Sequence, residues 1–303
     1  MNMKKETMGT LFALATAVIS GFSIIVNKFF VASIDPTVFT AVRAFIIGLV
    51  FLIIAFYRKD FSKGVKKINW PVMLLIGFIG GAVAFLLFFT GLGLTTGGRA
   101  AFLHKTLPLY TTLLAFLFLK ERITKKQVCA LVLMFLGTVA IYCTKINPTE
   151  LWSNPSLGDK LIIAATFLWA VENILARGVM IKKESNYIVT FSRMFFGSIF
   201  LFLAVFYFGK ADILFTLSHE QIIKIMVSTL FLFGYVFCWY NSIKLINVSK
   251  ASTLLLLAPV VSLILGVAVF GEPAPAMQLA GSAMILLGAF LVSRTKSEFV
   301  SGI

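Results

Sequence analysis

Ten long apolar runs divide this sequence from end to end, and each is long enough to form a helix across a lipid bilayer. The stretches between them are too short for a folded soluble domain. We expect the helices at 10–31, 36–57, 70–93, 97–119, 126–144, 158–180, 187–208, 221–243, 250–270 and 275–293. The predicted fold is therefore an all-α integral membrane protein with ten transmembrane helices.

The composition excludes most other classes of protein. Apolar residues make up 59% of the 303 residues and charged residues 13%, whereas soluble domains average about 45–50% and about 25%. The net charge of +15 does not indicate nucleic-acid binding, because the basic residues lie between apolar runs and not in one water-exposed cluster. None of Cys129, Cys143 and Cys238 has the spacing of a metal site. We predict no metal, no cofactor and no nucleic-acid partner.

The basic residues predict the orientation of the chain in the membrane. Of the 27 lysines and arginines, 17 fall on one side of the expected helices, four on the other and six inside the runs. Loops rich in basic residues stay in the cytoplasm. We therefore expect both termini in the cytoplasm, which also requires an even number of helices.

The two halves of the sequence align on each other at an offset of 150 or 151 residues. The matched pairs that chance supplies least easily are Arg43 with Arg193, Pro108 with Pro259, and Glu121 with Glu272. Each half holds five expected helices, and because five is odd the second half enters the membrane from the opposite side. We predict two inverted five-helix repeats, 1–150 and 151–303, an arrangement that suits alternating access.

The order of these features resembles the drug/metabolite transporter superfamily, EamA type. The resemblance rests on ten helices in two repeats, and on a proline in the fourth helix followed by Leu119-Lys120-Glu121-Arg122. The second half has Phe270-Gly271-Glu272-Pro273 at the corresponding place. The resemblance covers essentially the whole chain. It implies a transporter in a prokaryotic plasma (inner) membrane, most often an exporter of amino acids or other metabolites.

The function expected is secondary active transport. No GxxxxGK[ST] motif for nucleotide binding is present, so the energy comes from a gradient, with protons as the expected coupling ion, or from the substrate itself. Six basic residues against one acid inside the runs favour a small anionic or zwitterionic metabolite, such as an organic anion or an amino acid. The sequence shows no set of catalytic residues, so an enzyme is not expected. The main alternative is a flippase of a lipid-linked substrate, and a monomer or homodimer is expected.

Prolines in the middle of two helices indicate the substrate site. A proline inside a helix removes one backbone hydrogen bond and frees a carbonyl group, and broken helices at matching positions of two repeats mark the site in transporters. We assign Pro108 and Pro259 a gating or structural role. His104 and Lys105 lie within one turn of Pro108, and we expect both to bind substrate. The alternative for Lys105 is that its side chain extends to the membrane surface.

The sixth run carries Glu172, an acidic residue far from the ends of the expected helix. Trp169, Asn173 and Arg177 follow one another at four-residue steps and share a helix face, which Glu172 borders. Glu172 either contacts a proton or the substrate, or forms an ion pair with Lys105 or Arg177. We assign Trp169, Glu172 and Asn173 to the substrate site and Arg177 to gating or structure.

Polar and aromatic residues of two other runs complete the predicted substrate site. Ser23 and Asn27 belong to a polar stripe along the first run, and Tyr235 and Trp239 lie in the eighth. The alternatives are hydrogen bonds between helices for the stripe and an aromatic belt at the membrane surface for the rings.

Five further charged residues are assigned to gating or structure. We expect Arg43 and Arg193 to donate hydrogen bonds to carbonyl groups of a neighbouring helix. Glu121 and Glu272 precede the fifth and tenth runs, where a carboxylate suits the positive end of a helix. Arg99, at the start of the fourth run, is either a charge in the entrance to the site or an anchor at the membrane surface.

Overall fold

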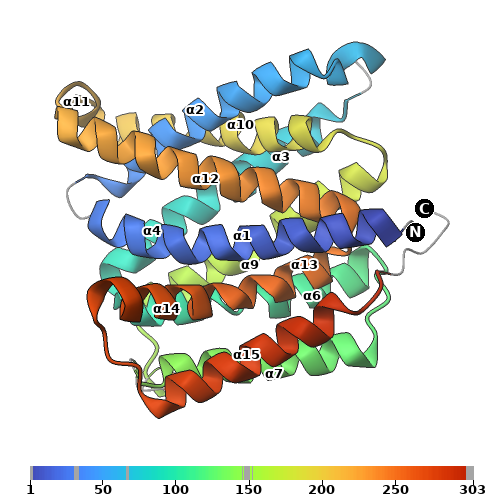
Figure 1. Cartoon of the computed structure of the whole chain (residues 1–303). Coiled ribbons are helices and arrows are strands. Elements are labelled where there is room, and N and C mark those ends of the chain that lie inside the picture. The colour runs from blue at the N-terminus through green and yellow to red at the C-terminus, as the bar shows by residue number, and fades with distance from the viewer. Residues whose placement is uncertain are drawn as a thin grey trace.

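The computed structural model describes residues 3–30, 34–65, 68–144, 146, 151 and 153–297, and within these ranges the chain forms helices and no strands (Figure 1). In the first half the α-helices are α1 (Met3–Phe30), α2 (Pro36–Tyr57), α3 (Trp70–Phe78), α4 (Ala84–Leu94), α5 (Gly97–His104), α6 (Leu107–Phe118) and α7 (Lys125–Tyr142). In the second half they are α9 (Leu157–Ile181), α10 (Asn186–Tyr207), α11 (Ala211–Phe215), α12 (His219–Leu245), α13 (Val248–Leu254), α14 (Ala258–Phe270) and α15 (Ala276–Ser293).

The predicted all-α membrane class is confirmed. Nine helical stretches of the described chain are long and apolar enough to cross a membrane. The helix α1, with 28 residues, runs alongside them and packs against α12. All ten predicted runs therefore coincide with helical segments, although α1 starts earlier than the first run because the polar residues before it are helical as well.

Three of the membrane-crossing stretches are interrupted. A π-helical turn, η4 (Ile79–Val83), joins α3 to α4, and a 3-10 turn, η5 (Leu255–Leu257), joins α13 to α14. The helices α5 and α6 are separated at Lys105 and Thr106. Pro108 and Pro259 each lie in the first turn of the helix that follows the interruption, a position where the missing N–H costs no hydrogen bond. The prolines thus begin new helices instead of bending continuous ones.

The helices pack in pairs that follow the predicted correspondence between the halves (Figure 1). Helix α2 lies along α10, and α7 lies along α15, so each of these four packs against its own counterpart. The pair α1 and α12 corresponds to the pair α9 and α4 with α3, and both pairs are in contact. The boundaries of the two repeats stay a prediction.

Glycines allow the closest of these contacts. A Cβ atom on Gly197 of α10 would lie 2.6 Å from the Cα atom of Gly81 in η4. A Cβ atom on Gly137 of α7 would lie 2.5 Å from the carbonyl oxygen of Gly281 in α15. Small residues let helix backbones approach in lipid, where packing and not the hydrophobic effect holds helices together.

We expect Gly197→Ala to destabilise the protein by about 1–3 kcal/mol, because the added methyl group meets backbone that cannot move away. The matched control is Gly93→Ala in α4, where a Cβ atom meets nothing within 4 Å. There the substitution should stabilise by about 0.5–1 kcal/mol, because alanine favours the helix. Melting temperatures in detergent measure both effects, and equal melting temperatures of the two variants would contradict the packing described.

Asp35 fixes the start of α2. Its Oδ1 atom accepts hydrogen bonds from the N–H groups of Thr37 and Val38, and its Oδ2 atom accepts one from Lys210 Nζ at 2.7 Å. Partial burial raises the pKa of the Asp35 carboxyl, but these hydrogen bonds and the lysine charge outweigh burial. The pKa therefore lies below its ordinary value.

Asp35→Asn should keep the helix cap, because asparagine caps helices as well as aspartate does, and lose the charge pair with Lys210. At neutral pH we expect a loss of at most about 1 kcal/mol, since the pair is partly exposed. Because the pKa of Asp35 is lower in the folded than in the unfolded protein, its ionised form stabilises the fold at pH values above the unfolded-state pKa of about 3.9. This stabilisation is lost as pH falls through the folded-state pKa. The difference in melting temperature between wild type and variant should therefore vanish in acid, and a difference independent of pH would contradict this account.

Candidate functional site

Helix α9 carries the centre of the candidate site. It packs against α4, α5 and α6 of the first half and contacts α12 and α10 of the second. Trp169, Glu172 and Asn173 point from it into the protein and are all buried, Glu172 completely. The structure thus brings these three predicted site residues to the middle of the helix bundle.

Glu172 joins α9 to two helices of its own half. Its Oε1 atom accepts a hydrogen bond of 2.5 Å from the Tyr240 hydroxyl of α12, and its Oε2 atom lies 3.6 Å from Arg193 Nε of α10. The Arg193 guanidinium also faces the Tyr240 ring, 5.9 Å from its centroid. The predicted ion pair of Glu172 with Lys105 or Arg177 is wrong, because Arg193 takes that place. Tyr240 was not predicted as a site residue, because its hydroxyl becomes a partner of Glu172 only when α12 packs beside α9.

The π-helical turn η4 is fitted to α9. Trp169 Nε1 donates a hydrogen bond of 3.0 Å to the Gly80 carbonyl oxygen. A Cβ atom on Gly80 would overlap the side chain of Glu172, so glycine is required for Glu172 to lie there. π-Helical turns change the backbone hydrogen-bond pattern and often occur at functional sites, and here Trp169 supplies a donor to that turn.

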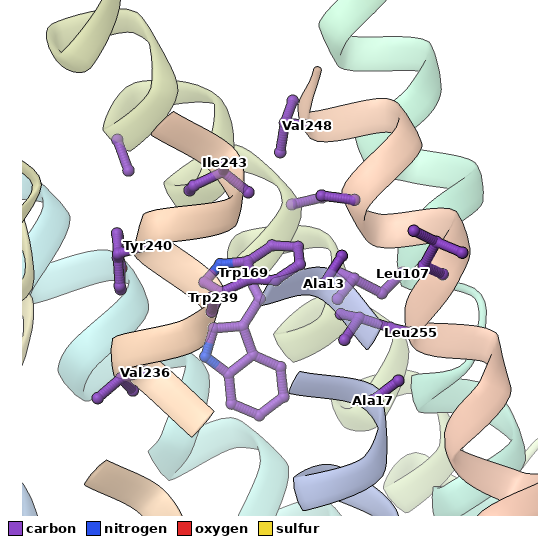
Figure 2. Close-up of a cluster of buried hydrophobic side chains, with 14 of the residues drawn as sticks. Ala13, Ala17, Leu107, Trp169, Val236, Trp239, Tyr240, Ile243, Val248 and Leu255 are labelled. Carbon is purple, nitrogen blue, oxygen red and sulfur yellow. The ribbon is translucent and has the colours of Figure 1, made fainter. Parts of the chain in front are cut away.

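Trp239 lies beside the same face of α9. Its Nε1 atom donates a hydrogen bond of 2.9 Å to Asn173 Oδ1, and Figure 2 shows both indoles in one cluster of buried side chains. Trp239 is 2% exposed, which excludes an aromatic belt at the membrane surface for this residue. Tyr235, one turn earlier in α12, is half-buried. Contact of these rings with substrate stays a prediction.

His104 and Lys105 lie where α5 ends. The His104 ring is edge-on to Trp169 and Phe88, with centroids 5.0 and 5.6 Å away, and its buried Nδ1 atom has no hydrogen-bond partner among the described residues. Lys105 is 7% exposed, so its side chain does not extend to the membrane surface as the alternative prediction required. In the described chain no hydrogen bond or ion pair engages it.

The free-energy cost of placing Lys105 inside a membrane helix exceeds the stabilisation that the end of α5 provides. A lysine in the middle of a membrane helix costs about 2.5–3.5 kcal/mol on insertion scales. A cation at the end of a helix gains about 0.3–1 kcal/mol from the helix dipole. The structure therefore leaves most of this cost uncompensated at the break between α5 and α6.

The arginines hold the helices together in a way that differs from the prediction. Arg43 donates a hydrogen bond of 2.6 Å to Ser228 Oγ of α12 and lies over the Phe39 ring. Arg193 forms the ion pair with Glu172. Arg177 instead donates to the carbonyl oxygens of Ile243 and Lys244 at the end of α12. The prediction that Arg43 and Arg193 donate to carbonyl groups is thus wrong, and Arg177 does so instead. The sequence does not show which arginine lies opposite the end of a neighbouring helix.

Glu121 caps a helix distant in sequence. Its carboxylate accepts hydrogen bonds from the Val248 N–H group, the Ser249 N–H group and the Ser249 hydroxyl, all at the start of α13. The prediction that it serves the fifth run is wrong, because α7 has its own cap from Thr124 and Gln127. Burial raises the pKa of Glu121, although Ser249, Val248 and the nearby Arg177 charge partly oppose it.

The counterpart of Glu121 behaves differently. Glu272 is half-buried in the loop after α14, and the structure gives its side chain no hydrogen bond within the described ranges. Ser23, on α1, is half-buried. Asn27 also lies on α1, but its side chain is outside the described part of the structure. Of these two predicted residues on α1, the structure therefore describes only the side chain of Ser23.

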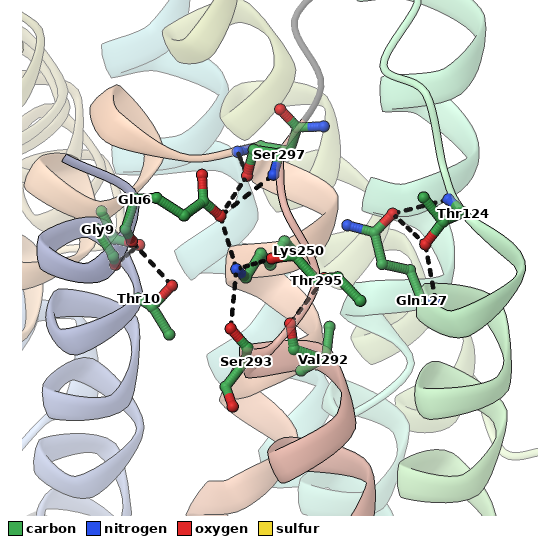
Figure 3. A network of polar contacts seen from close by, with 12 residues as sticks. Glu6, Gly9, Thr10, Thr124, Gln127, Lys250, Val292, Ser293, Thr295 and Ser297 are labelled. Atoms are coloured by element: carbon green, nitrogen blue, oxygen red, sulfur yellow. Dashed lines mark hydrogen bonds and ion pairs between the residues drawn. The ribbon is translucent and has the colours of Figure 1, made fainter. Parts of the chain in front are cut away.

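Two ion pairs lie at opposite ends of the bundle. Arg99 of α5 is half-buried and lies 3.6 Å from Asp159 of α9. Its role at the entrance to the site or at the membrane surface stays a prediction. At the other end Lys250 Nζ of α13 lies 2.7 Å from Glu6 Oε1 of α1 and donates to the Thr295 carbonyl oxygen (Figure 3). The sequence analysis counted Lys250 among the loop charges. Lys250 aligns with Arg99 at the 151-residue offset, and this match is the signal from which its buried ion pair could have been predicted.

Comparison with known proteins identifies the fold and the class of function. A family model described as the EamA-like transporter family matches residues 7–143 and again 156–294. The chain belongs to the EamA-like transporter family. It is therefore a multi-pass membrane transporter and not an enzyme, as the sequence predicted.

Relatives from several prokaryotes support this. The chain is 28% identical to the "Uncharacterized transporter YyaM" of Bacillus subtilis, over 92% of each chain. It is 26% identical to the "Probable amino-acid metabolite efflux pump" of Salmonella typhimurium, again over 92% of each. A crystal structure with 18% identity superposes with a TM-score of 0.78, covering 94% of this chain and 96% of that one, and this likeness shows the shared fold.

A double-mutant cycle tests the central ion pair. Glu172→Met and Arg193→Met should each destabilise by about 3–5 kcal/mol, because each leaves the other charge buried without its partner. The double variant should recover most of that loss. Glu220→Met, which removes an exposed carboxylate from the Lys224 pair, is the control and should change the melting temperature little. Additive losses in the double variant would show that the two residues do not act as a pair.

Proposed function

We propose that this transporter exports a small metabolite, an amino acid or an organic anion, by alternating access between two inverted repeats. The observation that carries the proposal is the interruption of the fourth predicted helix at Lys105 and Thr106. It directly follows His104, whose ring lies against Trp169 on the buried face of α9. A polar group is tolerated at this depth only where protein or a water-filled cavity satisfies it.

The second half has an interruption at the matching position. There α13 gives way to η5 and then to α14, which begins with Pro259 in its first turn. Paired interruptions in the two halves are the pattern expected for a substrate site at the middle of the membrane. We propose that the substrate is bound by His104 and Lys105 at the first interruption and by Trp169 of α9. Trp239 and residues of α1 would line the opposite side of the substrate.

The remaining details follow the sequence. We propose the plasma membrane as the location, with both termini cytoplasmic, which puts the Lys250–Glu6 pair at the cytoplasmic end. We propose protons as the coupling ion and Glu172 as their binding group, since it is the buried carboxylate of the described chain that lies far from a helix end. The name of the Salmonella relative supports a metabolite with a carboxyl group as the substrate.

Counterflow in proteoliposomes tests the proposal. Vesicles are preloaded with unlabelled amino acids, organic acids, organic cations or sugar phosphates, and uptake of the same labelled compound is followed. We expect uptake stimulated by the compound inside for at least one class, because alternating access exchanges substrate across the membrane. An imposed pH gradient should drive net uptake of the same compound.

Vesicles without protein are the control for leakage. Failure of every class to exchange, with protein shown to be folded, would contradict the proposal and favour a lipid substrate.

A further inference from the structure

We propose that the substrate carries a single carboxylate and no ammonium group, and that Lys105 binds this carboxylate. The substrate is thus an organic acid and not an amino acid. The inference rests on the proposed function, because it names the substrate class of the same site. It comes from the balance of buried charge, which only the structure reveals.

Eight charged side chains are buried in the described chain, five basic and three acidic. The acidic ones are Glu121, Asp159 and Glu172. All three are engaged: Glu121 by the start of α13, Asp159 by Arg99 and a hydroxyl, and Glu172 by Arg193 and a hydroxyl. The buried interior therefore holds no carboxylate that is free for a substrate.

Four of the five buried basic side chains also have partners. Arg193 and Lys250 face carboxylates, Arg177 bonds two main-chain carbonyls, and Arg43 has a hydroxyl and an aromatic ring. Lys105 alone among the five has no hydrogen bond and no ion pair within the described residues. A lysine side chain that is 7% exposed and has no acceptor is unfavourably placed, so an anion that enters from outside completes this position.

The surroundings of Lys105 suit a carboxylate with an apolar body. The 12-residue helix α6 starts two residues later, and the N-terminus of a helix favours an anion. The preceding residue, His104, has an unpartnered Nδ1 atom that can donate a second hydrogen bond. The rings of Phe88 and Trp169 lie against His104 and provide apolar surface beside these donors.

The same balance disfavours the other substrate classes. The ammonium group of an amino acid requires an acceptor, and at Glu172 it would have to displace Arg193, which lies 3.6 Å from the carboxylate. A dianion would bring one negative charge more than Lys105 neutralises. One uncompensated positive charge therefore matches one carboxylate.

Compounds that share a hydrocarbon side chain and differ in their carboxylate and ammonium groups test the inference. Counterflow is compared for 4-methyl-2-oxopentanoate, leucine and 3-methylbutylamine, and for phenylpyruvate, phenylalanine and 2-phenylethylamine. Glycerol 3-phosphate serves as the dianion. We expect the oxoacids to exchange at least tenfold faster than the amino acids, amines and dianion.

Substitutions at Lys105 identify the responsible group. Lys105→Met should reduce oxoacid exchange at least tenfold, while Lys105→Arg, which keeps the charge, should retain a measurable part. Lys126→Met makes the same change at an exposed position and should have no effect. Lys105→Met should also raise the melting temperature of the protein without substrate, because it removes an unpaired buried charge. A purely structural role would lower it.

The outcomes separate this inference from the proposed function. Exchange of amino acids faster than the matched oxoacids, unaffected by Lys105→Met, would overturn the inference and leave transport established. If nothing exchanges but an oxoacid raises the melting temperature of wild type and not of Lys105→Met, the proposed function fails and anion binding at Lys105 stands. Neither exchange nor stabilisation would overturn both.

Discussion

A lipid bilayer offers no water to the polar groups inside it, so every buried donor, acceptor and charge must find its partner within the chain. That requirement explains the main interactions of this structure. Glu121 bonds the start of α13, Arg177 bonds the end of α12, and Trp169 bonds the π-helical turn that Gly80 belongs to. Lys105 differs from the other buried basic side chains of the described chain in having no hydrogen bond and no ion pair. The neighbouring His104 Nδ1 atom also lacks a partner, so unsatisfied polar groups gather at the break between α5 and α6.

Much of the fold was predictable because hydropathy in a membrane protein acts over whole helices. The ten apolar runs coincide with the observed helical segments, and the match of Pro108 with Pro259 located both interruptions. The prolines were expected in the middle of continuous helices, whereas each lies in the first turn of a new helix. A proline is as suitable for the first turn of a new helix as for a bend, and the sequence pattern is the same in both cases.

The candidate site was predictable in its members and not in their partners. Trp169 and Asn173 were predicted to share a helix face because they lie four residues apart, and Glu172 was predicted to border that face. All three are buried, and their contact with substrate stays a prediction. The partner of Glu172 is Arg193, and the helix that Glu121 caps is α13. These pairings depend on which helices pack together and on how far each is shifted along its axis. A local sequence pattern carries neither piece of information. The repeat carried the nearest signal, since Lys250 aligns with Arg99 and both are paired.

The contacts of Lys250 also make the two ends of the bundle unequal. Glu6 accepts hydrogen bonds from both the main chain and the hydroxyl of Ser297, so the segment after α15 is tied to α1 and α13. The alignment of the halves puts Ile146 where the other end has Ser297, and isoleucine has no side-chain donor. A carrier with identical halves would rest equally in either of its two states. Under the alternating access proposed above, exchange of the two states would break contacts at one end that are not remade at the other. The proposed mechanism therefore implies unequal populations of the two states and different barriers for transport in the two directions.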